Sequence, residues 1–144
     1  MEAVVVYASQ FGNTRHIAEA IARGLGQGAR AVEAGSFSTA ELGPGSLLVV
    51  GSPIVGWKPL EGLGAWLDGL APGALDGVRA AAFDTRVKLF IHGDAAKKIE
   101  HALEKAGATR AAEPSWYYVK GQEGPLLDGE LDRAEAWGRE LAAA

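Results

Sequence analysis

A short segment rich in hydroxyl and amide side chains is the part of the chain best suited to bind an anion. It spans residues 9–14 and reads Ser-Gln-Phe-Gly-Asn-Thr. An unbroken apolar run from Ala3 to Tyr7 precedes it, and apolar residues at helical spacing follow it. This pattern predicts a buried strand, a tight turn that Gly12 lets pass close to a ligand, and a helix. The N–H groups and dipole at the start of such a helix favour a phosphate.

Features of the nucleotide phosphate loops are missing from this segment. The mononucleotide loop needs a lysine, and no lysine lies between Ser9 and Thr14. The dinucleotide loop needs three spaced glycines, and Gly12 is the single glycine of this segment. The remaining groups of this segment suit one terminal phosphate. The hydroxyls of Ser9 and Thr14, the amide of Asn13 and backbone N–H groups would hold it. An ordinary strand-to-helix turn, capped by Asn13 or Thr14, is the alternative interpretation.

Composition limits the other possibilities. The chain has 144 residues, of which 48% are hydrophobic and 22% charged, so we expect one globular domain over residues 1–144. The absence of cysteine excludes disulfides, thiolate catalysis and Cys-ligated clusters, and three scattered histidines offer no metal site. Any redox chemistry must come from an organic cofactor. A net charge of −4 argues against nucleic acid as a partner.

We expect a soluble, cytoplasmic and monomeric protein. The first three residues carry no basic leader, and the most apolar stretch, residues 47–57, is shorter than a membrane span requires.

Strands and amphipathic helices alternate along the whole chain. This alternation predicts an α/β fold with three layers, a doubly wound, five-stranded parallel sheet in the order 2-1-3-4-5. Ligands bind to such sheets beyond the carboxyl ends of the strands, where the strand order reverses. The expected strands are residues 3–7, 29–33, 46–51, 78–83 and 108–119, and the last is broken at Pro114. Four helices are expected: one follows Gly12, one starts at Pro59, one is capped by Asp94 and one is capped by Asp128.

Two further loops at these strand ends carry suitable side chains. The loop from Gly51 to Trp57 offers a flexible glycine and a large aromatic ring that can lie on a planar ligand. The loop from Asp84 to Gly93 offers backbone groups, a carboxylate and one aromatic. A phosphate cradle, a stacking ring and hydrogen-bonding groups for a ring edge together describe a site for FMN.

The chain resembles the short-chain flavodoxins. Residues 9–14 are similar to their FMN-phosphate loop, Thr/Ser-x-Thr/Ser-Gly-x-Thr, with Phe11 in place of the second hydroxyl residue, and 84–86, 93–96 and 119–126 look like a subgroup signature. The resemblance implies a flavodoxin-like fold and FMN stacked by Trp57, with Phe90 on the other side of the ring. The residues expected to bind FMN are Ser9, Gln10, Phe11, Gly12, Asn13, Thr14, Pro53, Ile54, Val55, Gly56, Trp57, Asp84, Thr85, Arg86, Phe90 and Gly93.

Several of these side chains have simpler interpretations. Trp57 could cap the next helix, and Phe90 could anchor its loop to the core. Three aromatics on one strand, Trp116 to Tyr118, are assigned to core packing.

Three functions remain open. The first is an electron carrier that serves a reductase and an acceptor protein. The second is a flavin enzyme, such as a quinone reductase or a protoporphyrinogen oxidase of flavodoxin type, and the third is a domain of the same fold without flavin. We favour the carrier because the chain has no long insertion and no evident acid–base pair beside the presumed ring.

The charges expected at the ring predict its redox behaviour. Lys58, Arg86, Lys88 and His92 outnumber the acidic Asp84 on the two loops. We therefore expect the lower one-electron reduction potential to be less negative than in acidic flavodoxins.

Overall fold

The central strands lie inside the molecule because their apolar residues point alternately to both faces. The computed structural model of the chain describes residues 2–88 and 93–144. In β1 (Ala3–Tyr7), Val4 and Val6 belong to one core cluster, and Val5 and Tyr7 belong to the other. β3 (Leu47–Val55) and β5 (Arg79–Val87) follow the same alternation, so a helical layer must cover each face of the sheet.

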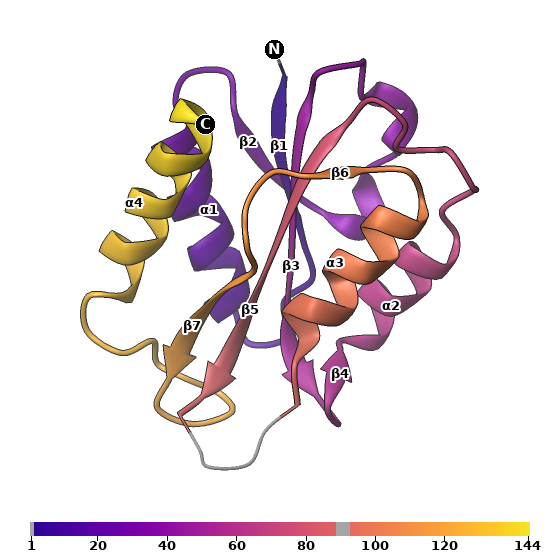
Figure 1. Cartoon of the computed structure of the whole chain (residues 1–144). Helices are drawn as coiled ribbons and strands as arrows, with labels where there is room; N and C mark the ends of the chain where they lie inside the picture. The colour runs from indigo at the N-terminus through magenta and orange to yellow at the C-terminus, as the bar shows by residue number, and fades with distance from the viewer. Residues whose placement is uncertain (1, 89–92) are drawn as a thin grey trace.

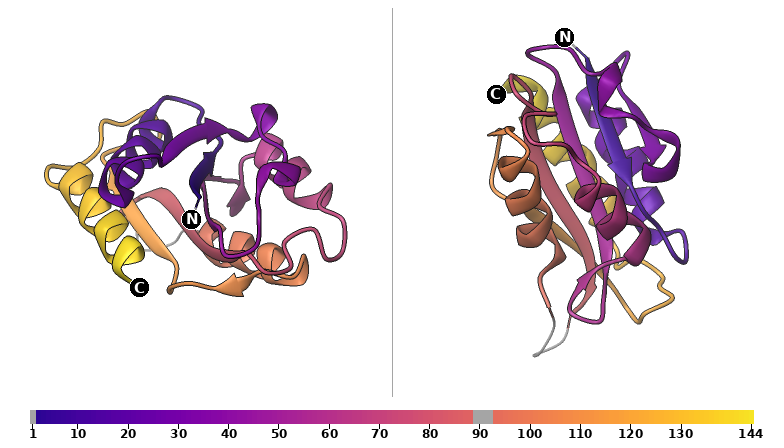
Figure 2. Two further views of the ribbon diagram at one scale, coloured as in Figure 1. Left: turned by 90° about the horizontal axis from the view of Figure 1, so that it is seen from above. Right: turned by 90° about the vertical axis from the view of Figure 1, so that its right-hand side faces the viewer.

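Four helices supply these two layers (Figure 1). α1 (Asn13–Leu25) and α4 (Glu130–Ala143) cover one face, and α2 (Glu61–Asp68) and α3 (Ala95–Lys105) cover the other. The two short 3₁₀ turns are η1 (Ala34–Ser36) and η2 (Thr39–Glu41). Within the described residues, each helix is too short or too polar to pass through a bilayer. Figure 2 shows the sheet between the two helical layers.

The strand order confirms the expected topology. β2 (Arg30–Glu33), β1, β3 and β5 are adjacent and parallel. The outer edge of β5 pairs first with β6 (Thr109–Arg110) and then with β7 (Ser115–Val119). These two short strands are the halves of the expected fifth strand, which breaks around Pro114 as predicted. An antiparallel strand that was not predicted, β4 (Lys58–Pro59), pairs with the end of β3.

The strands that lead to the carboxyl edge are longer than the sequence suggested. β3 continues through Val55 and β5 through Val87, because their ladder extends to Pro53 and Thr85, the end of β3 pairs with a further strand, and β7 pairs with β5 as far as Val87. Residues 52–55 and 84–87, expected in loops, therefore lie on strands.

Of the three expected helix starts after α1, one is confirmed and two are corrected. The Asp94 carboxylate accepts a hydrogen bond from the N–H of Lys97 at 2.9 Å, which confirms that cap. Asp128 is not the cap of α4, because Gly129 takes that position with φ +84° and without a side-chain bond. Pro59 lies in β4, before the first turn of α2.

Candidate functional site

A cavity of about 530 Å³ opens at the carboxyl edge of the sheet. Four segments that are far apart in the sequence form its wall: the start of α1, the turn after β3, the end of β5 with Gly93, and the loop after β7. This is the edge where the strand order reverses between β1 and β3, as expected for an α/β sheet. The lining residues are Gln10, Phe11, Asn13, Thr14, Pro53, Ile54, Val55, Gly56, Trp57, Thr85, Arg86, Val87, Gly93, Val119, Gly121 and Gln122.

At one end of the cavity, the first turn of α1 presents backbone donors. Gly12 caps the helix with φ +92° and without a side-chain bond, so neither Asn13 nor Thr14 is the cap. The Ser9 hydroxyl instead accepts from the N–H groups of Gly12 at 3.1 Å and Arg15 at 3.4 Å. Among the described residues, the N–H groups of Asn13 and Thr14 have no hydrogen-bond acceptor. Free donors at a helix N-terminus suit an anion.

The polar side chains of this turn hold the cavity wall together. The hydroxyl of Thr14 is buried and lies 2.8 Å from the hydroxyl of Thr85 on β5. The Asn13 amide donates to the carbonyl of Glu123 at 3.1 Å. These bonds join α1 to β5 and to the loop after β7, so the backbone N–H groups remain the main donors for an anion.

Trp57 lies in a two-residue turn between β3 and β4. Both Gly56 and Trp57 have positive φ, +57° and +71°, as a turn of type I′ requires. Trp57 is 56% exposed and lines the cavity, and its place in the turn excludes the alternative role as a cap of α2. Its large flat ring can cover one side of a planar aromatic ligand.

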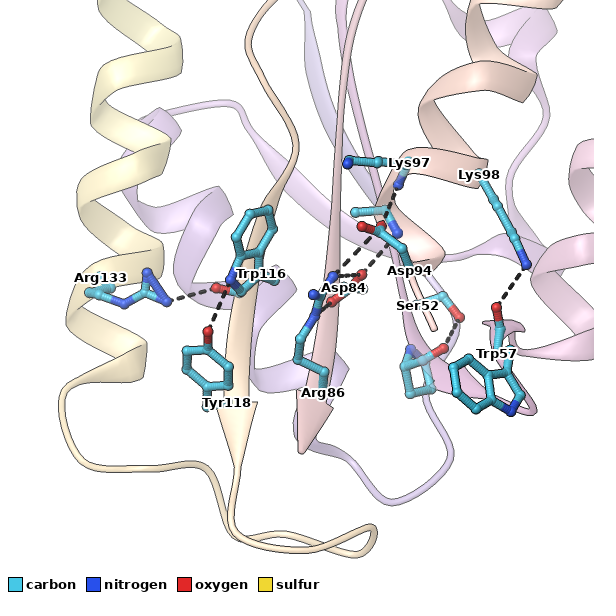
Figure 3. Close-up of polar contacts among 12 residues, drawn as sticks. Ser52, Trp57, Asp84, Arg86, Asp94, Lys97, Lys98, Trp116, Tyr118 and Arg133 are labelled. Carbon is cyan, nitrogen blue, oxygen red and sulfur yellow. Dashed lines mark hydrogen bonds and ion pairs between the residues drawn. The ribbon is translucent and has the colours of Figure 1, made fainter. Parts of the chain in front are cut away.

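Three contacts hold this turn in place, and Figure 3 shows the first of them. The Lys98 ammonium on α3 donates to the Trp57 carbonyl at 2.8 Å. The buried Ser52 hydroxyl accepts from the N–H of Leu60 at 2.8 Å, which closes the base of the hairpin. Gly93 packs on the Trp57 backbone so closely that a Cβ on Gly93 would collide with it.

Asp84 lies behind the cavity in a buried ion pair. Its carboxylate accepts from Arg86 at 2.8 and 2.6 Å and from the N–H of Ala96 at 2.9 Å (Figure 3). Asp94 lies 3.6 Å from the same guanidinium, which stacks on the ring of Trp116. Burial raises the pKa of the Asp84 carboxyl, and the hydrogen bonds from Arg86 and Ala96 oppose that rise.

This pair changes the charge expected at the cavity. Arg86 was counted as a free positive charge, but Asp84 and Asp94 offset it. Of the other expected positive charges, Lys58 and Lys88 are exposed and form no ion pair among the described residues, while His92 lies outside the described residues.

The structure brings most of the candidate residues into one wall. Ser9 and Gly12 shape the start of α1 beside the cavity, Asp84 lies behind it, and Phe90 lies outside the described residues. The other twelve candidates line the cavity and are found in the list above. The strand aromatics differ from one another: Tyr117 is fully buried as expected, whereas Trp116 is 37% exposed and was wrongly assigned to the core.

Sequence reasoning missed four lining residues, Val87, Val119, Gly121 and Gln122. The last three lie in the segment 119–126, which looked like a subgroup signature but received no role. Its position after the fifth strand of a parallel sheet was the available signal, because that strand ends at the same edge.

Comparison with known protein families assigns the chain to one family. The family model described as flavodoxin matches residues 5–137 of the chain. A search of curated proteins found no match.

Solved structures share the fold. A flavodoxin from the domain Archaea is 24% identical with a TM-score of 0.79, covering 99% of this chain and 97% of that one. Oxidised flavodoxin 1 from Bacillus cereus is 18% identical with a TM-score of 0.82, covering 99% and 98%. The flavodiiron protein from Giardia intestinalis is 19% identical with a TM-score of 0.75, but only 35% of that longer chain is matched.

Proposed function

Because the chain belongs to the flavodoxin family, whose cofactor is FMN, we propose that it is an electron carrier that holds FMN in this cavity. It passes electrons between redox partner proteins, a reductase and an acceptor, in the cytoplasm. One observation carries the proposal: free N–H groups at the start of α1 and the exposed ring of Trp57 line the same cavity.

The chemistry of the cavity fits FMN. A volume of about 530 Å³ is within the range of small-molecule sites. Hydroxyl, amide and N–H groups of α1 lie at one end, where a phosphate would bind. Pro53, Ile54, Val55 and Trp57 form an apolar wall, which would cover a flat ring system.

Each part of the chain has a distinct task in this proposal. The first turn of α1 would hold the phosphate, and the Thr14–Thr85 bond keeps that turn against β5. The hairpin with Trp57 would shield the ring from water on one side, with its position fixed by Ser52 and Lys98. FMN itself, when bound, supplies the capacity to take up and release electrons.

The polar groups of the cavity favour a carrier over a flavin enzyme. Among the described residues they are amides, hydroxyls and the guanidinium of Arg86. Burial lowers the pKa of Arg86, but the hydrogen bond and charge pairing with Asp84 raise it above its already high ordinary value. Such groups bind and orient a cofactor but do not exchange protons near neutral pH.

A redox experiment separates the two functions. The purified protein is loaded with FMN, photoreduced stepwise and mixed with ferricyanide, a one-electron acceptor, or with a small quinone. A carrier reduces ferricyanide rapidly and shows little turnover of quinone with a nicotinamide reductant. Saturable quinone turnover would assign the protein to the flavin enzymes, and failure to bind FMN would overturn both functions.

A further inference from the structure

Lysine is concentrated at the edge of the sheet that carries the cavity. Five of the six lysines lie there, and the sixth, Lys105, is at the far end of α3. We call the five the lysine rim; each is exposed, and the group is Lys58 in β4, Lys88 after β5, Lys97 and Lys98 in the first turn of α3, and Lys120 after β7.

The charge of the lysine rim is not neutralised locally. Throughout the described parts of the chain, every ion pair is formed by an arginine and none by a lysine. The carboxylates within four residues of a rim lysine are Glu61, Asp84, Asp94, Glu100 and Glu123. Of these, Asp84 and Asp94 are already engaged by Arg86, and Glu100 is engaged by Arg110. A chain with a net charge of −4 therefore presents a basic surface around its cavity.

Two exposed aromatic side chains lie at the same edge of the sheet as the lysine rim. Phe11 is 46% exposed and Trp57 is 56% exposed, and both line the cavity mouth. An apolar aromatic centre with a charged periphery is the usual composition of a protein–protein contact surface. The Lys98 ammonium binds the Trp57 carbonyl, which joins the rim to this centre.

We propose that the lysine rim is the docking surface for an acidic electron-transfer protein, one with carboxylates around its own redox centre. The assignment rests on the proposed function, because docking here would bring the partner to the cavity mouth. Complementary charge would speed the encounter against the net negative charge of the whole chain. Nucleic acid is a poorer match, because the lysines surround aromatic side chains and a cavity instead of following one continuous groove.

A binding experiment tests the surface without FMN. A fluorescent polyglutamate peptide is titrated with the apo-protein at low salt, and its anisotropy reports binding. Lys58→Glu and Lys120→Glu should each weaken binding at least about threefold, since each replaces an attractive charge by a repulsive one. Lys105→Glu makes the same change in net charge and should have no such effect. Equal losses in all three variants, or tighter binding of a single-stranded DNA of equal charge, would overturn the proposal.

An electron-transfer experiment tests the sign of the charge around the cavity in the protein loaded with FMN. The reduced FMN form is oxidised by ferricyanide, an anion, and by hexaammineruthenium(III), a cation. The ferricyanide rate should fall at least about threefold when salt rises from about 0.01 M to about 0.2 M, because screening removes the attraction. The cation should show the opposite trend.

The two possible failures have different signatures. A ferricyanide rate that rises with salt, in protein that binds FMN, would overturn the docking surface and leave the carrier function standing. Protein that binds polyglutamate through the rim but takes up no FMN would overturn the carrier function instead.

Discussion

At the scale of single residues, Trp57 combines a bulky side chain with a backbone conformation that glycine adopts more easily. Its φ of +71° places Cβ close to the following carbonyl, a strain worth about 1–2 kcal/mol. The surrounding contacts from Ser52, Gly93 and Lys98 hold the turn in this conformation. Such strain is retained where a side chain is needed for function.

Substitution of Trp57 separates strain from stacking. We expect Trp57→Gly to have a free energy of unfolding about 1 kcal/mol higher than Trp57→Ala, because glycine fits the turn without strain. Both variants should bind flavin about 1–2 kcal/mol more weakly than the parent chain, because both lose the ring. Chemical denaturation and fluorescence titration measure the two effects. Unchanged flavin affinity in both variants would show that the ring does not contact the cofactor.

The ion pair of Asp84 and Arg86 predicts a pH-dependent loss of stability. Arg86→Gln leaves a buried carboxylate without its counter-charge, which should cost about 3–5 kcal/mol at neutral pH. The pKa of Asp84 is already raised by burial and rises further without Arg86. The loss should therefore shrink as pH falls through that pKa, because the protonated carboxyl needs no counter-charge.

Urea denaturation of the variant at pH 7 and pH 4.5 measures this dependence. Arg139→Gln removes an exposed ion pair with Glu135 and should change stability by no more than about 0.5 kcal/mol. A loss for Arg86→Gln that is small, or the same at both pH values, would contradict the role given to the pair.

At the scale of elements, two glycines determine how closely α1 and α4 pack. A Cβ on Gly24 would collide with the carbonyl oxygen of Glu135, and one on Gly138 with the carbonyl oxygen of Ile21. The helices thus meet backbone to backbone on the face of the sheet where α1 starts the cavity (Figure 1). This contact fixes the direction of α1 and, with it, the position of its N-terminus.

Alanine at these positions should separate the helices. Gly24→Ala and Gly138→Ala gain up to about 1 kcal/mol of helix propensity but lose more by overpacking, for a net loss of about 1–3 kcal/mol. Gly64→Ala in α2, where no atom lies within 4 Å of the added methyl, should keep the gain. Thermal unfolding compares the three variants. Stabilisation by all three would mean that α1 and α4 do not make this close contact.

The sequence predicted the elements better than their ends. Apolar runs identified β1, β3 and β5 because burial on both faces leaves an unambiguous pattern. The extension of β3 to Val55 depends on pairing with β5 and β4, and the extension of β5 to Val87 depends on pairing with β7, neither of which the apolar pattern of the strand itself encodes. The hairpin at Trp57 was missed because its turn places a tryptophan where glycine or asparagine is usual.

The side-chain partners of the cavity wall were equally hidden from the sequence. The Thr14–Thr85 and Asn13–Glu123 bonds join positions more than seventy residues apart. Asp84 was expected at a ligand because it offers a carboxylate in a loop at a strand end, whereas its position in β5 turns it inward toward the N–H of Ala96. Motif and topology thus located the cavity, and only the packed structure assigned each side chain to its wall.

At the scale of the whole molecule, the cavity and most of the lysines lie at one edge of the sheet. The carboxyl ends of the strands carry the cavity, its exposed aromatics and the lysine rim. The chain as a whole is acidic, with a net charge of −4. A partner therefore encounters an electric field that distinguishes this edge from the rest of the surface.

The central claim is that the start of α1 holds the phosphate of FMN. Calorimetric titration of the apo-protein with FMN and with riboflavin tests it most directly, because the two ligands differ only by that phosphate. Each N–H bond to the dianion is worth about 1.5–3 kcal/mol, so FMN should bind at least about 100-fold more tightly. In Trp57→Ala both ligands should weaken together, so that their ratio is kept. Equal affinities of the parent chain for FMN and riboflavin would contradict the account.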